Sequence, residues 1–274
     1  MAGRTPLRAL SGLLVALVLA LPVSGGTPPE FDHSYGVWHG VLRQHVRWLP
    51  DGLQTRVDYR GVAADRARLT SALQALSEVD AAAFERWSRA QQIAFLVNAY
   101  NAFTVELILT GWPGLGSIKD LGSVIRSPWK QPFFTLLGAQ RHLDWIEHEQ
   151  LRPRYGEPRL HAALNCASIG CPALRPEPFV AARLEAQLEE SMKRFLADRT
   201  RNRVVDGRLE VSMVFKWYAG DFERGHGGLH SVADLFARYA DQLSDDPSVR
   251  AALRRKTLDV THLPYDWSLN VLHP

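Results

Sequence analysis

Both cysteines of the chain lie in one short segment, HAALNCASIGCP (residues 161–172), which also contains His161. The thiolate is the reactive form of cysteine, and a neighbouring histidine that takes the thiol proton makes the sulfur a nucleophile. Four residues, including a glycine, separate Cys166 from Cys171, and such a spacing also suits a disulfide that closes a tight loop. The segment therefore predicts either a catalytic thiol with a histidine base or a local covalent link.

Two further interpretations use the same side chains. A zinc site would take His148, His161, Cys166 and Cys171, but their spacing matches no familiar zinc motif. Redox exchange usually employs cysteines separated by two residues, whereas these are separated by four. We expect no metal and no cofactor, and the sequence contains no glycine-rich phosphate loop. The thiol enzyme and the structural disulfide remain the two leading hypotheses.

The choice of histidine depends on the backbone of residues 159–166. The run RLHAALNC is interpreted as a short buried strand, in which residues five apart point to opposite faces. His161 then reaches Cys166 only where the chain bends near Asn165. His148, on the preceding predicted helix, has no such restriction and is the second candidate base.

The longest predicted helix, residues 82–110, carries polar groups that are candidates for orienting a base. From Ile93 onward this helix is apolar nearly all round, which predicts burial. Asn98 and Asn101 are exceptions, and their spacing places them on one face. Buried amides need hydrogen-bond partners. They either hold the backbone of a neighbouring loop or orient a catalytic group, with Asn98 as orienter or oxyanion donor.

Another polar group lies at the end of a short predicted helix, MVFKWY (residues 213–218). Lys216, Trp217 and Asp221 are the candidate binding residues there. Lys216 and Asp221 are spaced to form an ion pair that anchors the helix end. Asp221 is also a candidate for the third polar group that orients a catalytic imidazole.

The overall pattern predicts one α+β domain, mostly helical, with a small antiparallel sheet. The thiol hypothesis adds a distant likeness to cysteine peptidases and transglutaminases. A short strand is expected at TRVDYRGV (residues 55–62), and hairpins at TLLGAQRHL (residues 135–143) and around Asp206-Gly207. Further helices are predicted at residues 35–49, 64–77, 145–152, 180–197, 232–239 and 247–254.

The first 25 residues have the layout of a secretory signal peptide. Arg4 and Arg8 precede an apolar run from Ala9 to Leu21, and small residues follow at positions 23–25. The run is shorter than the roughly 20 residues that span a bilayer. We therefore expect cleavage, a periplasmic or secreted protein, and no stable membrane span afterwards. An oxidising compartment lets a disulfide persist.

Charge narrows the expected partners. The formal charge is +3, and removing the two arginines Arg4 and Arg8 leaves +1. A chain this close to neutral has no broad basic surface for nucleic acid. The expected partner is therefore a small-molecule or peptide substrate.

Six stretches in chain order resemble the domain-of-unknown-function 547 family. They are FLVNAYNAFTVELIL, SIKDLGSVIRSPWK, LDWIEHEQLRP, PRLHAALNCASIGCPALR, VFKWYAGDF and YDWSLN. The resemblance runs from about Val57 to Asn270 and marks the chain as similar to an exported bacterial member. Together with the predicted signal peptide (1–25), it leaves a lead-in with one helix (26–56) and a family domain (57–274), which we expect to fold as one unit with that helix.

The resemblance implies less about activity, because the family is known by its sequence and not by an established reaction. Plant relatives that look cytosolic keep the cysteine that corresponds to Cys166 and often lack the second one. A disulfide is then not the shared purpose of the family. The sequence predicts a cysteine-dependent hydrolase or acyl transferase, with Cys166 as nucleophile. The alternative is a non-catalytic binding or scaffold protein with a Cys166–Cys171 disulfide.

Overall fold

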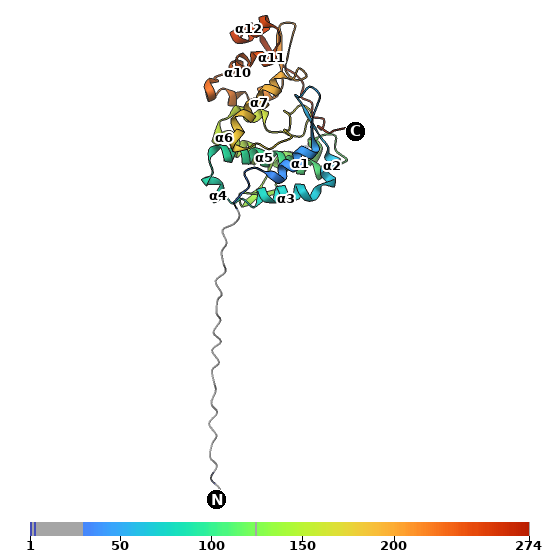
Figure 1. Ribbon diagram of the computed structural model, residues 1–274, viewed down its shortest axis with the longest axis vertical. Helices are drawn as coiled ribbons and strands as arrows, with labels where there is room; N and C mark the ends of the chain where they lie inside the picture. Colours follow the sequence, from blue (N-terminus) through green and yellow to red (C-terminus); the bar gives the residue numbers. More distant parts are fainter. Residues whose placement is uncertain (2, 4–29, 124, 274) are drawn as a thin grey trace. The chain divides into compact units, whose positions relative to one another are not determined.

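The computed structural model describes residues 1, 3, 30–123 and 125–273. The chain divides into two units, Met1–Glu30 and Phe31–Pro274. Every helix and strand below belongs to the second unit, shown in colour in Figure 1. The predicted signal peptide lies outside the described residues except at positions 1 and 3, so export stays a prediction.

A long buried helix, α5, forms the centre of the first hydrophobic core. Four helices precede it: α1 (Gly36–His45), α2 (Tyr59–Ala64), α3 (Arg66–Ser77) and α4 (Ala81–Arg86). The single helix predicted at residues 82–110 is wrong, because α4 ends before an extended Trp87 and α5 (Arg89–Leu109) begins anew. Ser88 caps α5 in a reciprocal arrangement with Gln91, which satisfies backbone donors at the new helix start.

By length and composition, α5 is also the one described helix that would suffice to cross a membrane. Of its most apolar window, 89% is buried inside the fold. Its apolar character is therefore that of a core helix, which must bury every face.

The strands are short and form three small sheets. β1 (Val46–Trp48) pairs antiparallel with β2 (Thr55–Val57), so the helix predicted at residues 35–49 gives way to a strand after His45. The two predicted hairpins are confirmed as β3 (Phe134–Leu136) with β4 (Ala139–Arg141), and β5 (Arg203–Val205) with β6 (Arg208–Val211). A strand that the sequence did not predict, β7 (Asp259–His262), pairs parallel with β6.

The C-terminal half is helical again and builds a second hydrophobic core. Its helices are α7 (Leu184–Ala197), α8 (Val214–Trp217), α9 (Ala219–Phe222), α10 (Val232–Arg238), α11 (Ala240–Leu243) and α12 (Pro247–Arg255). Figure 1 shows α10, α11 and α12 gathered at one end of the unit. Helix α7 joins the two cores, since Leu188 packs in the first and Phe195 in the second. The mostly helical α+β class is confirmed.

The segment that leads to the cysteines differs most from its prediction. A π-helix, η3 (Trp145–Leu151), continues into α6 (Arg152–Tyr155), and a 3-10 helix, η4 (Pro158–Ala162), follows. The strand predicted at residues 159–166 is therefore wrong. Pro158 stands at the first helical position, and the Glu157 side chain accepts a hydrogen bond from the backbone N–H of Arg159. Both features favour the start of a helical turn. The rule that residues five apart in a strand point to opposite faces therefore does not separate His161 from Cys166.

Candidate functional site

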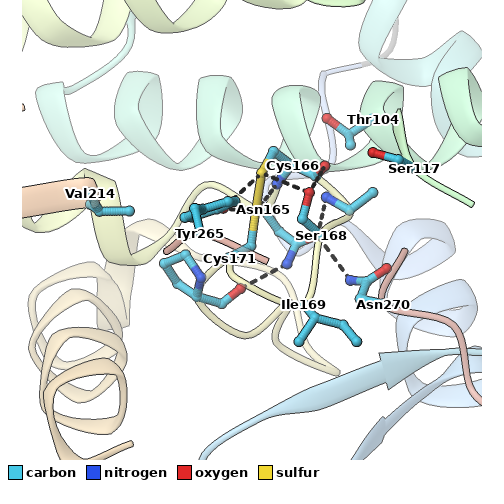
Figure 2. Close-up of a disulfide and its surroundings, with 12 residues drawn as sticks. Thr104, Ser117, Asn165, Cys166, Ser168, Ile169, Cys171, Val214, Tyr265 and Asn270 are labelled. Atoms are coloured by element: carbon cyan, nitrogen blue, oxygen red, sulfur yellow. Dashed lines mark hydrogen bonds between the residues drawn. A yellow bond between two sulfur atoms is a disulfide. The ribbon is translucent and has the colours of Figure 1, made fainter. Parts of the chain in front are cut away.

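The two cysteines form a disulfide at the end of a short loop. Figure 2 shows the bond between Cys166 and Cys171, with Tyr265 beside both sulfurs. The Tyr265 hydroxyl lies 3.3 Å from Cys166 Sγ and donates to Cys171 Sγ at 3.2 Å. The backbone N–H of Cys166 also donates to Cys171 Sγ, at 2.9 Å. Cys171 is buried, whereas Cys166 is half-buried.

The chain turns sharply around Asn165, and that side chain holds the turn. Its amide oxygen accepts from the backbone N–H of Ala167 at 2.9 Å, and its Nδ2 donates to the carbonyl of Pro172 at 2.7 Å. Ala167 has a φ of 63°, a left-handed conformation that a residue with a Cβ adopts only when its surroundings enforce it. The Cys166 sulfur is therefore held in a defined position.

The two α5 amides both bind backbone. Asn101 accepts from the N–H of Asn165 at 2.8 Å and donates to the carbonyl of Ala163 at 3.0 Å. Asn98 makes the equivalent pair of bonds with Phe179, at 3.0 and 2.7 Å. Asn101 thus fixes the approach to Cys166, while Asn98 fixes a different segment.

A cavity of about 240 Å³ opens beside the disulfide. Its walls come from both hydrophobic cores and from the C-terminal tail. The lining residues are Tyr100, Trp129, Asp144, Glu147, His148, His161, Leu164, Cys166, Cys171, Pro172, Val214, Trp217, Tyr218, Tyr265 and Trp267. Cys166 and both candidate histidines therefore meet in one cavity, whereas Asn98, Asn101, Lys216 and Asp221 do not line it.

His161 is the histidine that a carboxylate holds in place. Its Nε2 donates to Asp221 Oδ2 at 2.8 Å, and its ring stacks on Tyr218 with 3.8 Å between centroids. The side chain of His161 is 3% exposed. Because Asp221 accepts from Nε2, the proton resides there and Nδ1 is left as the basic nitrogen.

Asp221 is itself held by two arginines. Arg152 Nε donates to Oδ2 at 2.5 Å, and Arg224 Nη2 lies 3.0 Å from Oδ1. Burial by itself would raise the pKa of Asp221, but hydrogen bonds and charge from His161 and Arg152 outweigh it and hold that pKa well below its usual value. The carboxylate is therefore ionised at neutral pH. The ion pair expected between Lys216 and Asp221 is wrong, and Lys216 is exposed.

His148 occupies a more open position on η3. Arg152 Nη1 lies 2.7 Å from its Nδ1, and Asp144 Oδ1 lies 3.8 Å from its Nε2. Its side chain is 38% exposed, so no neighbour fixes it as closely as Asp221 fixes His161. His161 is therefore the more firmly held of the two histidines that line the cavity.

The π-helix also brings a buried carboxylate, Glu147, into the wall of the cavity, at a position for which the sequence predicted only a helix. Glu147 is 5% exposed. Burial raises the pKa of the neighbouring Tyr218 and Tyr100 hydroxyls, and the charge of Glu147 raises both further. Burial likewise raises the pKa of Asp144. Arg152, Tyr218, Tyr265 and Trp267 were missed too, although all four stand in or beside the quoted family stretches.

Gly170 makes the close approach of the tail to the disulfide loop possible. A Cβ at this position would lie 2.8 Å from Tyr265 Cζ and 2.9 Å from the carbonyl oxygen of Asp266. We expect Gly170→Ala to cost about 1–3 kcal/mol of unfolding free energy, because tyrosine and backbone must both move. Urea denaturation checks this, with Gly220→Ala, which meets nothing within 4 Å, as control. Equal stability of the two variants would contradict the close packing.

Among the described residues, no group of three or more His, Cys, Asp or Glu side chains has a geometry that could hold a metal ion.

Comparison with known proteins gives one match to a family model and no known reaction. Residues 84–196 match the family described as "Protein of unknown function, DUF547". Neither the curated proteins nor the solved structures contain a match. The matched segment includes Cys166, Cys171 and His161 and ends before Asp221.

Proposed function

We propose that this chain, a DUF547 protein by its central segment, is a cysteine-dependent hydrolase or acyl transferase that is latent while Cys166 is bonded to Cys171. One observation carries the proposal. The sulfur of Cys166 and the imidazole of His161, which Asp221 holds by its other nitrogen, share one cavity. A thiol, a base and a carboxylate that orients the base are the parts of a thiol nucleophile.

Reduction by an external thiol or dithiol would release Cys166. His161 Nδ1 would then take the thiol proton, while Asp221 stabilises the positive charge that forms on the ring. The thiolate would attack an acyl carbon and form a C–S bond while the bond to the leaving group breaks, and the imidazolium would give its proton to that group. Water or another acceptor would then displace the sulfur from the acyl carbon, with the imidazole taking the acceptor's proton and returning it to the sulfur. The acid or new acyl product leaves the thiol free for the next turnover.

The Tyr265 hydroxyl lies within 3.3 Å of Cys166 Sγ, next to where an oxyanion would develop. Burial raises the pKa of Tyr265 above its usual value, so the hydroxyl keeps its proton at neutral pH and can donate. We include Tyr265 as the oxyanion donor in place of Asn98, because the Asn98 amide is engaged with Phe179.

Iodoacetamide labelling followed by mass spectrometry tests the proposal. We expect no labelling of the oxidised protein, labelling at Cys166 after mild reduction, and labelling of Cys171→Ser without any reductant. His161→Gln should slow labelling at pH 7 by about tenfold or more, since base assistance is typically worth 10²–10⁴-fold in catalysis. His148→Gln should have little effect.

Cys166→Ser is the control for the labelled position, and near-ultraviolet circular dichroism confirms that each variant is folded. A folded, reduced protein in which Cys166 stays unlabelled would overturn the thiol mechanism. So would equal labelling rates in the His161 and His148 variants.

The second candidate function is a non-catalytic binding or scaffold protein that the disulfide stabilises. The formed bond and the burial of Cys171, which is 3% exposed, favour it. In that case reduction changes stability alone and the cavity still binds its ligand. Both functions fit our proposal of a periplasmic or secreted protein with a small-molecule or peptide partner, where an oxidising compartment would keep the bond closed.

A further inference from the structure

We propose that the cavity binds the cationic end of its ligand, a protonated amine or a quaternary ammonium group. This inference deepens the proposed function by naming a substrate class, and it rests on that function only for the claim that the bound molecule reacts. Binding itself follows from the walls of the cavity.

The described walls of the cavity carry two carboxylates and no lysine or arginine. Asp144 and Glu147 line the cavity, and none of its described lining residues is a lysine or an arginine. Glu147 is 5% exposed and lies beside the hydroxyl-bearing rings of Tyr100 and Tyr218. Arg152 also interacts with the charge of Glu147, but its guanidinium is hydrogen-bonded to Asp221, and His148 lies 3.8 Å from Asp144. Burying carboxylates is costly when the nearby cations are shared with other groups, and a bound cation would add positive charge there.

Much of the remaining lining is aromatic. Trp217, Tyr265 and Trp267 contact one another, with ring centroids 4.5–5.7 Å apart, and Trp129 meets Trp267 at 5.7 Å. Trp217 is 44% exposed, which is unusual for so large an apolar side chain. Aromatic faces attract ammonium groups through the negative charge of their π-systems, and the attraction grows where water is excluded.

One cation already uses this cluster. Lys119 Nζ lies 3.8 Å from the ring centroid of Trp267. Lys119 is not among the residues that line the cavity, whereas Trp267 is. An ammonium group therefore already rests on one ring of this aromatic cluster in the fold.

Charge complementarity excludes the other ligand classes. An anionic group in the cavity would lie beside Glu147 and Asp144 and be repelled by both. A purely apolar ligand would remove water from Glu147 without replacing its hydrogen bonds or providing a positive charge. A cation with an apolar surface satisfies the acidic and the aromatic walls together.

The test uses two small molecules of nearly the same shape, choline and its uncharged carbon analogue 3,3-dimethyl-1-butanol. Both are titrated into a Cys166→Ser, Cys171→Ser double variant, and the fluorescence of the cavity tryptophans and calorimetry report binding. We expect choline to bind about tenfold or more tightly than the alcohol. Glu147→Gln should remove most of that preference without changing the affinity for the alcohol.

Glu149→Gln is the matched control, since Glu149 is exposed on the same π-helix and does not line the cavity. It should keep the preference for choline. Equal binding of the two molecules, no binding of either, or an unchanged preference in Glu147→Gln would overturn the proposal. The double variant has no thiol, so this result is separate from labelling. If choline binds but Cys166 of the reduced protein is not labelled, only the enzyme proposal is refuted. If Cys166 is labelled but choline binds no more tightly than the alcohol, only the cation site is refuted.

Discussion

Replacing Asp221 with alanine is expected to lower the free energy of unfolding by about 3 kcal/mol, the lower end of the cost of breaking a buried ion pair. The carboxylate accepts from His161 and Arg152 at once, and His161 is almost fully buried. Without Asp221 the imidazole N–H and the guanidinium lose their acceptor in a place that little water reaches. Urea denaturation at pH 7 measures the loss.

Asp241→Ala is the control for this measurement. Asp241 ion-pairs with Arg250 and Arg254, yet its side chain is 55% exposed. Exposed pairs are worth about 0–1 kcal/mol. If the two variants lost the same stability, the Asp221 contacts would not be the anchor that the structure shows.

The pH dependence gives an independent check on Asp221. Its pKa in the folded protein lies below the ordinary 3.8, so the folded state binds this proton more weakly than the unfolded state. The stabilisation is then fully present above about pH 4 and is lost progressively as pH falls through and below that value. The stability difference between wild type and Asp221→Asn should shrink in that acidic range. A difference that grows on acidification would contradict this sign.

Replacing Asn101 with alanine should have the second largest effect, and it should act on stability and on the thiol together. The variant leaves the buried N–H of Asn165 and the buried carbonyl of Ala163 without partners. Each such group costs about 1–3 kcal/mol, so we expect the two together to cost about 2 kcal/mol, the lower end of their sum. The Asn165 turn that positions Cys166 would also loosen, and the iodoacetamide rate of the reduced protein should change several-fold.

Asn98→Ala is a closely matched control. It lies one turn away on α5 and removes the same two kinds of bond, but from Phe179. It should lose similar stability and leave the labelling rate unchanged. If both variants alter the rate equally, the effect on the thiol is a general loosening of the fold and not the positioning of the loop by Asn101.

The parts of the fold that depend on neighbours in sequence were predictable. The Asp206-Gly207 turn is confirmed, with φ of 49° and 74°, because few residue pairs other than Asp-Gly or Asn-Gly adopt two positive values. The hydroxyl of Ser212 accepts from the N–H of Val214 at the start of α8, a bond between residues two apart in the sequence. These structures are decided by the backbone preferences of two or three adjacent residues.

Short apolar runs were not predictable in the same way. The run LHAAL (residues 160–164) would be buried equally well as a strand or as a helical turn, so its composition cannot choose between them. The turn formed because Pro158 and the cap from Glu157 favour it locally and because Asn101 binds the backbone that follows. Of these, the contact with α5 spans more than sixty positions and leaves no periodic signal in the sequence.

Motifs and spacing are local properties, so the sequence alone predicted the match of the central segment to the DUF547 model, the helical α+β class and a cysteine pair close enough to bond. The groups that surround that pair depend on tertiary packing. Asp221 lies sixty residues from His161, and Tyr265 ninety-nine from Cys166. Such partners are selected by the packing of two cores against each other, since a hydrogen bond forms between whichever donor and acceptor that packing brings within about 3 Å.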